Sequence, residues 1–270
     1  GYDTPSIRRR VAEMASFFGI QTWFYKNVTE LSGGQKQLLN LASVMALGPR
    51  VLILDEPTSQ LDPIAASDFL AALGKINREL GTTVILTEHR LEEAFGFATR
   101  VAVLEQGTVL CSGTPAEVGE RLKESGNGMF LAMPAAMRIW SAVDSSAPCP
   151  VSVCEGRQWL HGFAAQHPLG PLPAARESAA QEQTVVQAEE LWFRYEKDLP
   201  DVVKGLSLEL HRGEFLALLG GNGTGKSTSL KLLAGLQKAY RGELHITGRV
   251  GMLPQNPQTL FVKNTVREDL

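Results

Sequence analysis

The stretch GGNGTGKST, residues 220–228, restricts the possible folds of this chain more than any other feature. It fits the pattern G-x-x-x-x-G-K-[ST], and an apolar run, FLALL, comes directly before it. In this context, between a strand and a helix, the backbone N–H groups of such a loop turn inward around a phosphate, beside the positive end of the helix dipole. We expect a phosphate-binding loop in a parallel α/β sheet with helices on both faces, and an ordinary glycine turn is the alternative.

The side chains of this loop suggest how a nucleotide would be bound. Lys226 would neutralise β- and γ-phosphate oxygens, and the hydroxyl of Ser227 would ligate Mg²⁺. ATP and Mg²⁺ are therefore the expected ligands. The residues expected to bind the nucleotide here are Gly220, Asn222, Gly223, Gly225, Lys226, Ser227 and Thr228.

A second motif is VLILDE at residues 51–56, four apolar residues followed by two carboxylates. Asp55 would hold Mg²⁺, and Glu56 would orient or deprotonate an attacking water. Taken alone the motif is weak evidence, because apolar strands often end in acids. SGGQ upstream and SQLD downstream strengthen it considerably.

Capping and turn residues predict most of the remaining elements. A helix should begin just after Ser32 and end before Gly48, and another should run over residues 62–80 and end at Gly81. TPAE, from Thr114, fits a capping box at a third helix. Because strands alternate with helices, the sheet should be parallel. The expected strands are residues 51–54, 82–89, a pair around residues 106–107, and residues 184–195, 205–211, 215–219, 242–246 and 249–255.

Composition excludes several classes of protein. A net charge of -3 gives no reason to expect a nucleic acid partner, and 44% hydrophobic residues suffice for a packed core. No run of residues is long and apolar enough for a membrane span, and no secretory signal is visible, so a cytosolic location is expected. The cysteines Cys111, Cys149 and Cys154 lack metal-ligand spacing. Because the chain has no initiating Met and stops within TVREDL, we expect it to be a piece of a longer protein.

Residues 126–184 differ in composition from the rest of the chain, because they contain many Ala, Pro and Gly and few charged residues. We expect a linker with one or two short helices, such as AAMRIWSAV and CEGRQWLHGFAA. It would separate two regions, residues 1–125 and residues 185–270.

The motifs together resemble ATP-binding cassette (ABC) ATPases. LSGGQ (with Ser32, Gly33, Gly34 and Gln35), LDEP, SQLD and the TEHR around His89 resemble the signature, Walker B, D-loop and switch histidine of the second half of a cassette. Tyr195, the glycine loop and Gln255 in LPQNP resemble the adenine-stacking aromatic, Walker A and Q-loop of the first half. The chain therefore looks like the back half of one cassette, a linker, and the front half of the next. The resemblance implies the P-loop NTPase sheet with helices on both faces, together with the helical subdomain of an ABC cassette.

The resemblance implies a division of roles. Ser32, Gly33 and Gly34 would close over a γ-phosphate held by Lys226, using a hydroxyl and helix amides. Asp55, Glu56 and His89 would serve a second site, so that neither site is whole within these residues. Mg²⁺ would be held by Ser227, Asp55 and Gln255. For Tyr195 a plain strand-end aromatic remains the alternative.

Three segments are similar in sequence to the fused twin ATPases of energy-coupling factor importers. They are LTEHRLEEAFGFATRVAVLEQG, SGTPAEV and MPAAMRIW. This resemblance implies a subunit that hydrolyses ATP to power vitamin or metal-ion uptake. Its partners would be transmembrane coupling and substrate-binding subunits at the inner face of the membrane. Gln60 departs from the family, in which an alanine is usual in the D-loop.

Two other classes share many of these motifs. Twin-cassette ATPases that act on ribosomes have long charged linkers, and those that act on DNA add C-x-x-C zinc modules. Residues 126–184 carry few charges and no such module. A non-catalytic nucleotide-binding module is the third possibility, and the presence of both carboxylates, the Lys and the His argues against it.

One expectation concerns how the two halves of the chain fold together. Each half alone would leave apolar strand edges unpaired. Closing a long linker costs little, since loop entropy grows logarithmically. We therefore predict one joined sheet, in which residues 215–219 lie between residues 84–86 and residues 101–104.

Overall fold

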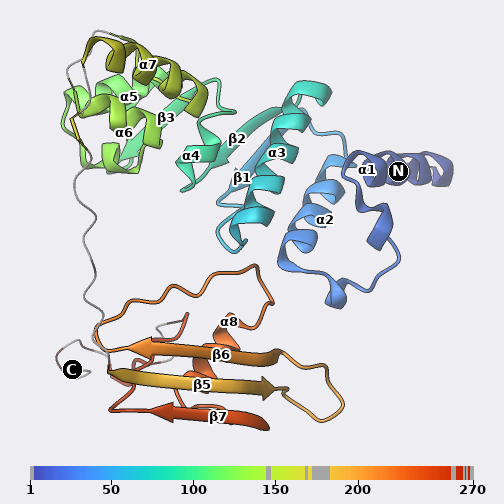
Figure 1. Cartoon of the computed structure of the whole chain (residues 1–270). Helices are drawn as coiled ribbons and strands as arrows, with labels where there is room; N and C mark the ends of the chain where they lie inside the picture. Colours follow the sequence, from blue (N-terminus) through green and yellow to red (C-terminus); the bar gives the residue numbers. More distant parts are fainter. Residues whose placement is uncertain are drawn as a thin grey trace. The chain divides into compact units, whose positions relative to one another are not determined.

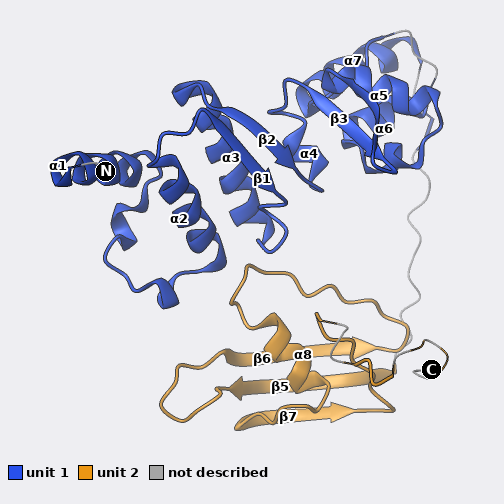
Figure 2. Cartoon of the chain, turned by 180° about the vertical axis from the view of Figure 1, so that it is seen from behind, with its two compact units in different colours: residues 1–173 blue, residues 174–270 orange. Residues whose placement is uncertain are grey.

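The computed structural model describes residues 3–143, 147–167, 170–171, 183–256, 260–263, 265 and 267. It divides into two compact units, unit 1 with residues 1–173 and unit 2 with residues 174–270 (Figure 2). Both units contain helices and strands (Figure 1).

The elements of unit 1 are, in chain order, α1 (Thr4–Phe17), η1 (Ile20–Trp23), η2 (Val28–Glu30), α2 (Gly33–Met45), β1 (Val51–Asp55), α3 (Pro63–Leu80), β2 (Thr83–Thr87), α4 (Leu91–Ala94), β3 (Val101–Glu105), β4 (Thr108–Gly113), α5 (Pro115–Glu124), η3 (Gly128–Ala132), α6 (Ala135–Ser141) and α7 (Val153–Gln166). The elements of unit 2 are β5 (Thr184–Phe193), β6 (Val203–His211), α8 (Lys226–Leu233) and β7 (Arg241–Ile246).

Strands β1 and β2 pair in parallel, with Asp55 opposite Thr87 at their carboxyl ends. Helix α3 connects them, so the three elements form a βαβ unit. Leu52 of β1 packs with Phe69 and Ile76 of α3 in the main hydrophobic cluster of unit 1. The predicted α/β class with a parallel sheet is confirmed, and the parallel pairing lies between these two strands.

Local sequence signals explain the limits of α3. The Asp62 carboxylate accepts hydrogen bonds from the N–H groups of Ile64 and Ala65 at 3.1 and 3.0 Å, and Pro63 occupies the first turn. Gly81 closes the helix in the left-handed conformation, with φ at 66°. The predicted helix over residues 62–80 is therefore confirmed.

A second hydrophobic cluster lies around β3, β4 and α5. Val118 and Leu122 of α5 pack there with Met137 and Trp140 of α6. Both short helices expected within residues 126–184 form, as α6 and α7, and α6 adds buried side chains to the core of unit 1. The domain boundaries expected from the sequence stay a prediction.

Unit 2 is built on an antiparallel sheet with the strand order β6-β5-β7. Leu232 of α8 packs against Phe193 and Val203 of this sheet in a small buried cluster. The strands predicted at residues 184–195, 205–211 and 242–246 are confirmed with small shifts at their ends.

Two predicted strands are absent from the described residues, and the predicted joined sheet is wrong. Neither residues 215–219 nor residues 249–255 form a strand, and Phe215 is 94% exposed. Strands β1–β2, β3–β4 and β5–β7 form three separate sheets. Every strand pair that forms lies within one unit, whereas inserting residues 215–219 would pair a strand of unit 2 with strands of unit 1, the least local pairing in the chain.

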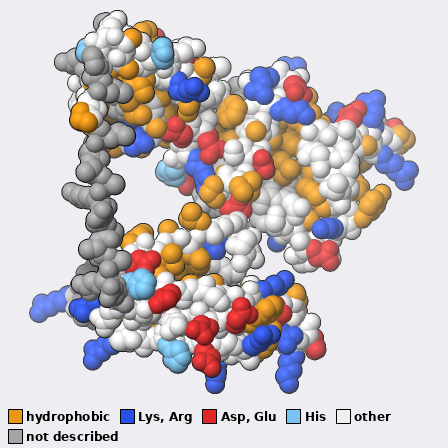
Figure 3. Space-filling model, in the orientation of Figure 1, with side chains coloured by type: hydrophobic (Ala, Val, Ile, Leu, Met, Phe, Trp, Pro, Cys, Tyr) orange, Lys and Arg blue, Asp and Glu red, His pale blue; other side chains and the backbone are white. Residues whose placement is uncertain are grey.

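The sheet face of β1 and β2 that points away from the hydrophobic cluster carries apolar side chains at the surface. Ile53 is 73% exposed and Ile85 is 54% exposed, whereas Leu52 is 4% exposed. This alternation follows from the two-residue period of a strand. On the face drawn in Figure 3, hydrophobic side chains are interspersed among charged ones.

Candidate functional site

The two carboxylates of the VLILDE motif, Asp55 and Glu56, lie where two parallel strands end. The Thr87 hydroxyl donates to Asp55 Oδ1 at 2.6 Å. The Glu56 N–H lies 3.0 Å from Thr87 Oγ1 and 3.2 Å from Thr87 O. Glu56 itself has φ at 43°, a left-handed conformation that is uncommon for a residue other than glycine. The end of β2 therefore holds both acidic residues in place.

Glu56 and His89 are brought together by the turns that follow β1 and β2. His89 Nε2 lies 2.8 Å from Glu56 Oε1. Both side chains are open to solvent, with exposures of 78% for His89 and 46% for Glu56. A water molecule can therefore reach a carboxylate that an imidazole orients, which is the arrangement that general-base chemistry needs.

The signature residues form the amino end of α2. Ser32 caps the helix, with its Oγ accepting from the Gln35 N–H at 3.2 Å, and Gln35 Oε1 accepts from the Ser32 N–H at 3.0 Å. The helix predicted to begin after Ser32 is confirmed. In this capping box the Ser32 hydroxyl only accepts a hydrogen bond, through one lone pair. Its O–H can therefore still donate to an anion.

Gly34 has a packing role within unit 1. A Cβ built at Gly34 would lie 2.8 Å from the Cβ of Ala65 on α3, closer than two such atoms can approach. Helices α2 and α3 therefore touch through small residues at this point. Gly33, its neighbour, has open space around the corresponding position.

The glycine loop leads directly into α8, whose first residue is Lys226. Gly225 precedes it with φ at 91°, and a Cβ there would lie 2.7 Å from the carbonyl oxygen of Val202. Within the described residues, no side chain caps the amino end of α8. The loop thus has the glycine cradle and the uncapped helix end that a phosphate group fits.

Lys226 lies folded over its own loop. Its ammonium donates to the carbonyl oxygen of Gly220 at 2.7 Å and to that of Gly221. Ser227 follows with an exposed side chain on the first turn of α8, whereas Thr228 is buried. Asn222 and Gly223, between the two ends of the loop, are exposed.

The structure also places Tyr195 beside this loop. Its hydroxyl lies 3.0 Å from Thr228 Oγ1, and its ring packs edge-on against Phe193 with the centroids 5.1 Å apart. The Tyr195 side chain remains 53% exposed, which leaves part of the ring accessible. Gln255 is exposed in a segment without helix or strand.

The residues predicted to hold Mg²⁺ are divided between the units. Asp55 belongs to unit 1, whereas Ser227 and Gln255 belong to unit 2. All three offer oxygen ligands, which Mg²⁺ prefers. In the part of the chain that the structure describes, no three His, Cys, Asp or Glu side chains gather as a metal site.

Sequence reasoning missed three residues that support the site, Thr58, Thr87 and Glu88. Thr58 is fully buried, and its hydroxyl donates to Glu88 Oε1 at 2.7 Å. The parallel register that places Thr87 beside Asp55 could be anticipated, because both residues end adjacent strands. The sequence contains no comparable pattern that would predict the contact between Thr58 and Glu88.

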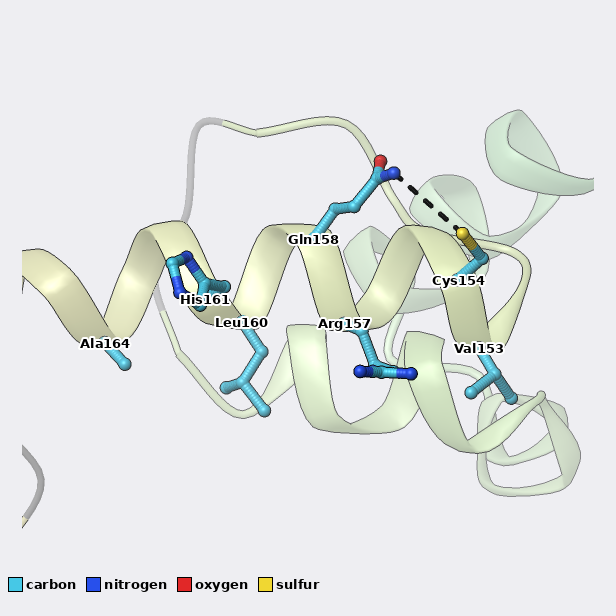
Figure 4. A pocket seen from close by; sticks show the side chains of 7 residues that line it. All are labelled: Val153, Cys154, Arg157, Gln158, Leu160, His161 and Ala164. Carbon is cyan, nitrogen blue, oxygen red and sulfur yellow. Dashed lines mark hydrogen bonds between the residues drawn. The ribbon is translucent and has the colours of Figure 1, made fainter.

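A surface hollow of about 900 Å³ lies on α7 (Figure 4). Gln158 Nε2 lies 3.9 Å from Cys154 Sγ within it. Its lining residues are Val153, Cys154, Arg157, Gln158, Leu160, His161 and Ala164. None of the predicted site residues contributes to it.

Comparisons with known proteins agree with the sequence motifs. The family model described as "ABC transporter" matches residues 4–59 and 203–269. A Bacillus thuringiensis protein named "Putative ABC transporter ATP-binding protein" is 39% identical over 285 residues, covering 100% of this chain and 50% of its own length. A protein of the same name from Clostridium tetani is 33% identical, covering 99% of this chain and 61% of its own length.

Among solved structures, CbiO1 of Clostridium perfringens, part of the ABC transporter complex CbiONQ, is 33% identical, with a TM-score of 0.42. It covers 47% of this chain and 51% of its own chain. The chain spans about half the length of the curated relatives from the genus Bacillus that it matches. In the described residues no helix is long and apolar enough to cross a membrane.

Proposed function

Because the chain belongs to the family of ABC transporter ATP-binding proteins, we propose that it is part of a subunit that binds and hydrolyses ATP to power a membrane importer of the energy-coupling factor type. The observation that carries the catalytic part of this proposal is the 2.8 Å contact between Glu56 and His89 at the carboxyl ends of parallel strands. This geometry supports water activation beside a phosphate.

The nucleotide would be held by unit 2. The glycine cradle and the uncapped end of α8 suit the phosphates, and Lys226 would exchange its bonds with the loop carbonyls for phosphate oxygens. The Tyr195 ring, held beside α8 through Thr228, would stack on the adenine. When bound, Mg²⁺ would neutralise phosphate charge at this site, with Ser227 and Gln255 as its proposed protein ligands, and Asp55 would ligate Mg²⁺ at the second site.

We further propose that catalytic residues and phosphate-binding residues from different cassettes work together. Ser32, Gly33 and Gly34 would cover the γ-phosphate bound at Lys226, with the Ser32 hydroxyl donating. Glu56 would take a proton from the attacking water, and His89 would hold the Glu56 carboxylate in position. Asp55 and these two residues would serve a second nucleotide, bound by another glycine loop.

The amino-acid sequence of residues 86–107 and 112–118 supports the importer class, because it resembles the sequences of energy-coupling factor ATPases. The proposed partners are transmembrane coupling and substrate-binding subunits, with this subunit at the inner face of the membrane. ATP and Mg²⁺ are the proposed ligands, and a nucleic acid partner is not part of the proposal.

The test uses the full-length protein. Lys226→Ala should abolish ATP binding at the loop in unit 2, measured with a fluorescent ATP analogue. Lys231→Ala, on the same helix, is the matched control and should bind normally. Affinity purification from detergent-solubilised membranes should recover membrane-spanning subunits. Recovery of ribosomes or DNA in their place would overturn the importer proposal but leave the ATPase standing.

A further inference from the structure

Glu88 lies between two turns that the proposed chemistry depends on. Its Oε1 accepts hydrogen bonds from the Thr58 hydroxyl at 2.7 Å and from the N–H groups of His89 and Arg90 at 3.1 and 3.2 Å. Three donors thus converge on one carboxylate oxygen. The other oxygen, Oε2, is buried and has no hydrogen-bond partner in the described parts of the protein.

The first of these turns, residues 56–61, begins with Glu56, the predicted catalytic carboxylate. Pro57, Thr58 and Leu61 are its buried residues. The Thr58 carbonyl accepts from the Leu61 N–H at 3.0 Å, so Thr58 is part of the hydrogen bonding that shapes the turn. Glu88 holds this turn from the side of β2.

The second turn, residues 88–90, carries His89 and is held to the first by two separate side chains. Glu88 contacts Thr58, and the Arg90 guanidinium donates to the Leu61 carbonyl at 3.2 Å. The Glu88 carboxylate also fixes the backbone N–H of His89 itself. The position of the imidazole relative to Glu56 therefore depends on the clamp that Glu88 forms.

We propose that Glu88 is a positioning residue that holds His89 against Glu56 by joining the 88–90 turn to Thr58. This inference rests on the proposed function, because its consequence for activity is read through Glu56 and His89. Glu88 acts as a hydrogen-bond acceptor through Oε1. A neutral acceptor of the same shape should therefore replace it.

The test compares Glu88→Gln with Glu88→Ala in the full-length protein. The Gln amide oxygen keeps the acceptor, so kcat for ATP hydrolysis should stay within about threefold of wild type. The Ala variant loses all three bonds, and kcat should fall about 10- to 100-fold because a small displacement of a catalytic group is costly. KM for ATP should not change in either variant, since no nucleotide-binding residue is altered. An equal loss in both variants would assign the role to charge and overturn the proposal.

Double variants separate positioning from general support of the fold. If Glu88 acts through His89, Glu88→Ala should cause no further loss in a His89→Ala background. A full additional loss would contradict the proposal. Thr58→Val, which removes the buried hydroxyl with little change of shape, should reproduce part of the Glu88→Ala effect, and Thr58→Ser should not.

Amide hydrogen exchange tests the geometry without any activity. The exchange of the His89 and Arg90 amides should accelerate in Glu88→Ala and remain slow in Glu88→Gln. Unchanged exchange in Glu88→Ala would overturn the positioning role even if the ATPase is confirmed. If the wild-type protein shows no ATP hydrolysis that Glu56→Gln abolishes, the proposed function fails, and the exchange result still decides whether Glu88 forms the clamp.

Discussion

Two exposed residues, Glu56 and His89, form a close pair that contributes little to stability. Ion pairs open to solvent typically contribute at most about 1 kcal/mol, and these side chains are 46% and 78% exposed. Glu56 also has a left-handed backbone, which costs on the order of 1–2 kcal/mol for a residue with a Cβ. A strained residue in a contact of low energetic value is typical of a site selected for chemistry.

The role proposed for Glu56 predicts a specific kinetic effect. Glu56→Gln in the full-length protein keeps the size of the side chain but removes the base, so turnover should fall about 10²-fold or more while ATP binding is retained. Single-turnover hydrolysis and equilibrium nucleotide binding measure the two properties separately. Glu124→Gln, an exposed carboxylate of α5, is the control and should leave both unchanged. Normal single-turnover hydrolysis by Glu56→Gln at this site would exclude the role.

The cysteines of unit 1 should differ in reactivity. Burial, with the nearby Glu120 charge, raises the pKa of the Cys149 thiol to about 12, whereas Cys154 is exposed on α7. Since the thiolate is the reactive form, iodoacetamide at pH about 8 should modify Cys154 and spare Cys149. Mass spectrometry of the native protein would measure this. Both should react once guanidinium unfolds the protein, and equal native rates would contradict the buried position of Cys149.

At the scale of elements, the limits of helices follow from short local signals. Ser32 with Gln35, Asp62 with Gly81, and Thr114 each end or begin a helix where the sequence predicts. These signals act within a few residues, so no tertiary contact is needed to interpret them. The strand predicted at residues 215–219 failed for the opposite reason. An apolar run becomes a strand only when a neighbouring strand pairs with it.

The candidate site also contains features that local sequence predicts and features that depend on tertiary packing. Asp55, Glu56 and Lys226 could be proposed as site residues from the sequence, because their motifs are contiguous. The contact of Glu56 with His89 follows once the parallel register of β1 and β2 is known. The Thr58–Glu88 bond could not be predicted, because it depends on how two turns pack after both strands are in place.

The capping box of α5 gives a prediction on pH. The backbone N–H and then the hydroxyl of Thr114 lower the pKa of Glu117 below its ordinary value of 4.5. Because the folded pKa is depressed, the stabilisation is present above the ordinary value and is lost as pH falls through the folded pKa. Amide exchange within α5 should therefore be slower in wild type than in Glu117→Gln at pH 7. The two proteins should converge at acid pH.

A second variant checks the same cap. Thr114→Ala removes the hydroxyl that accepts from the Glu117 N–H and should destabilise the amino end of α5 by about 1 kcal/mol. Thr114→Ser keeps the acceptor and should behave as wild type. If the difference in α5 amide exchange between wild type and Glu117→Gln stayed constant from pH 7 to acid pH, ionisation of Glu117 would not contribute to the stability of the helix.

At the scale of the whole molecule, the predicted site residues are distributed over two units. Unit 1 carries Ser32, Glu56 and His89, and unit 2 carries Tyr195 and Lys226. Ser32 and the phosphate-binding loop that it is proposed to cover therefore belong to different folded units. Hydrolysis under the proposed mechanism requires an assembly step beyond the folding of either unit.

This requirement leads to a prediction for Ser32. In the full-length protein, Ser32→Arg should leave ATP binding at the Lys226 loop unchanged and block ATP hydrolysis, because a bulky cation at this cap would obstruct closure over the nucleotide. Ser43→Arg, exposed on the same helix, is the matched control and should remain active. Full hydrolysis by Ser32→Arg would defeat the assembly scheme.

The close approach of α2 and α3 at Gly34 has a genetic consequence. A loss of function in Gly34→Ala would not by itself report on the nucleotide, since the new methyl group collides with Ala65 inside the same unit. If packing is the cause, Ala65→Gly should act as a second-site suppressor and restore activity despite its cost of about 1 kcal/mol in helix propensity. A selection for revertants that never returns position 65 would instead assign Gly34 to the ligand. If Gly34 contacts the ligand, the residues at positions 34 and 65 should vary independently of each other in evolution. If Gly34 is required for packing, substitutions at the two positions should occur together.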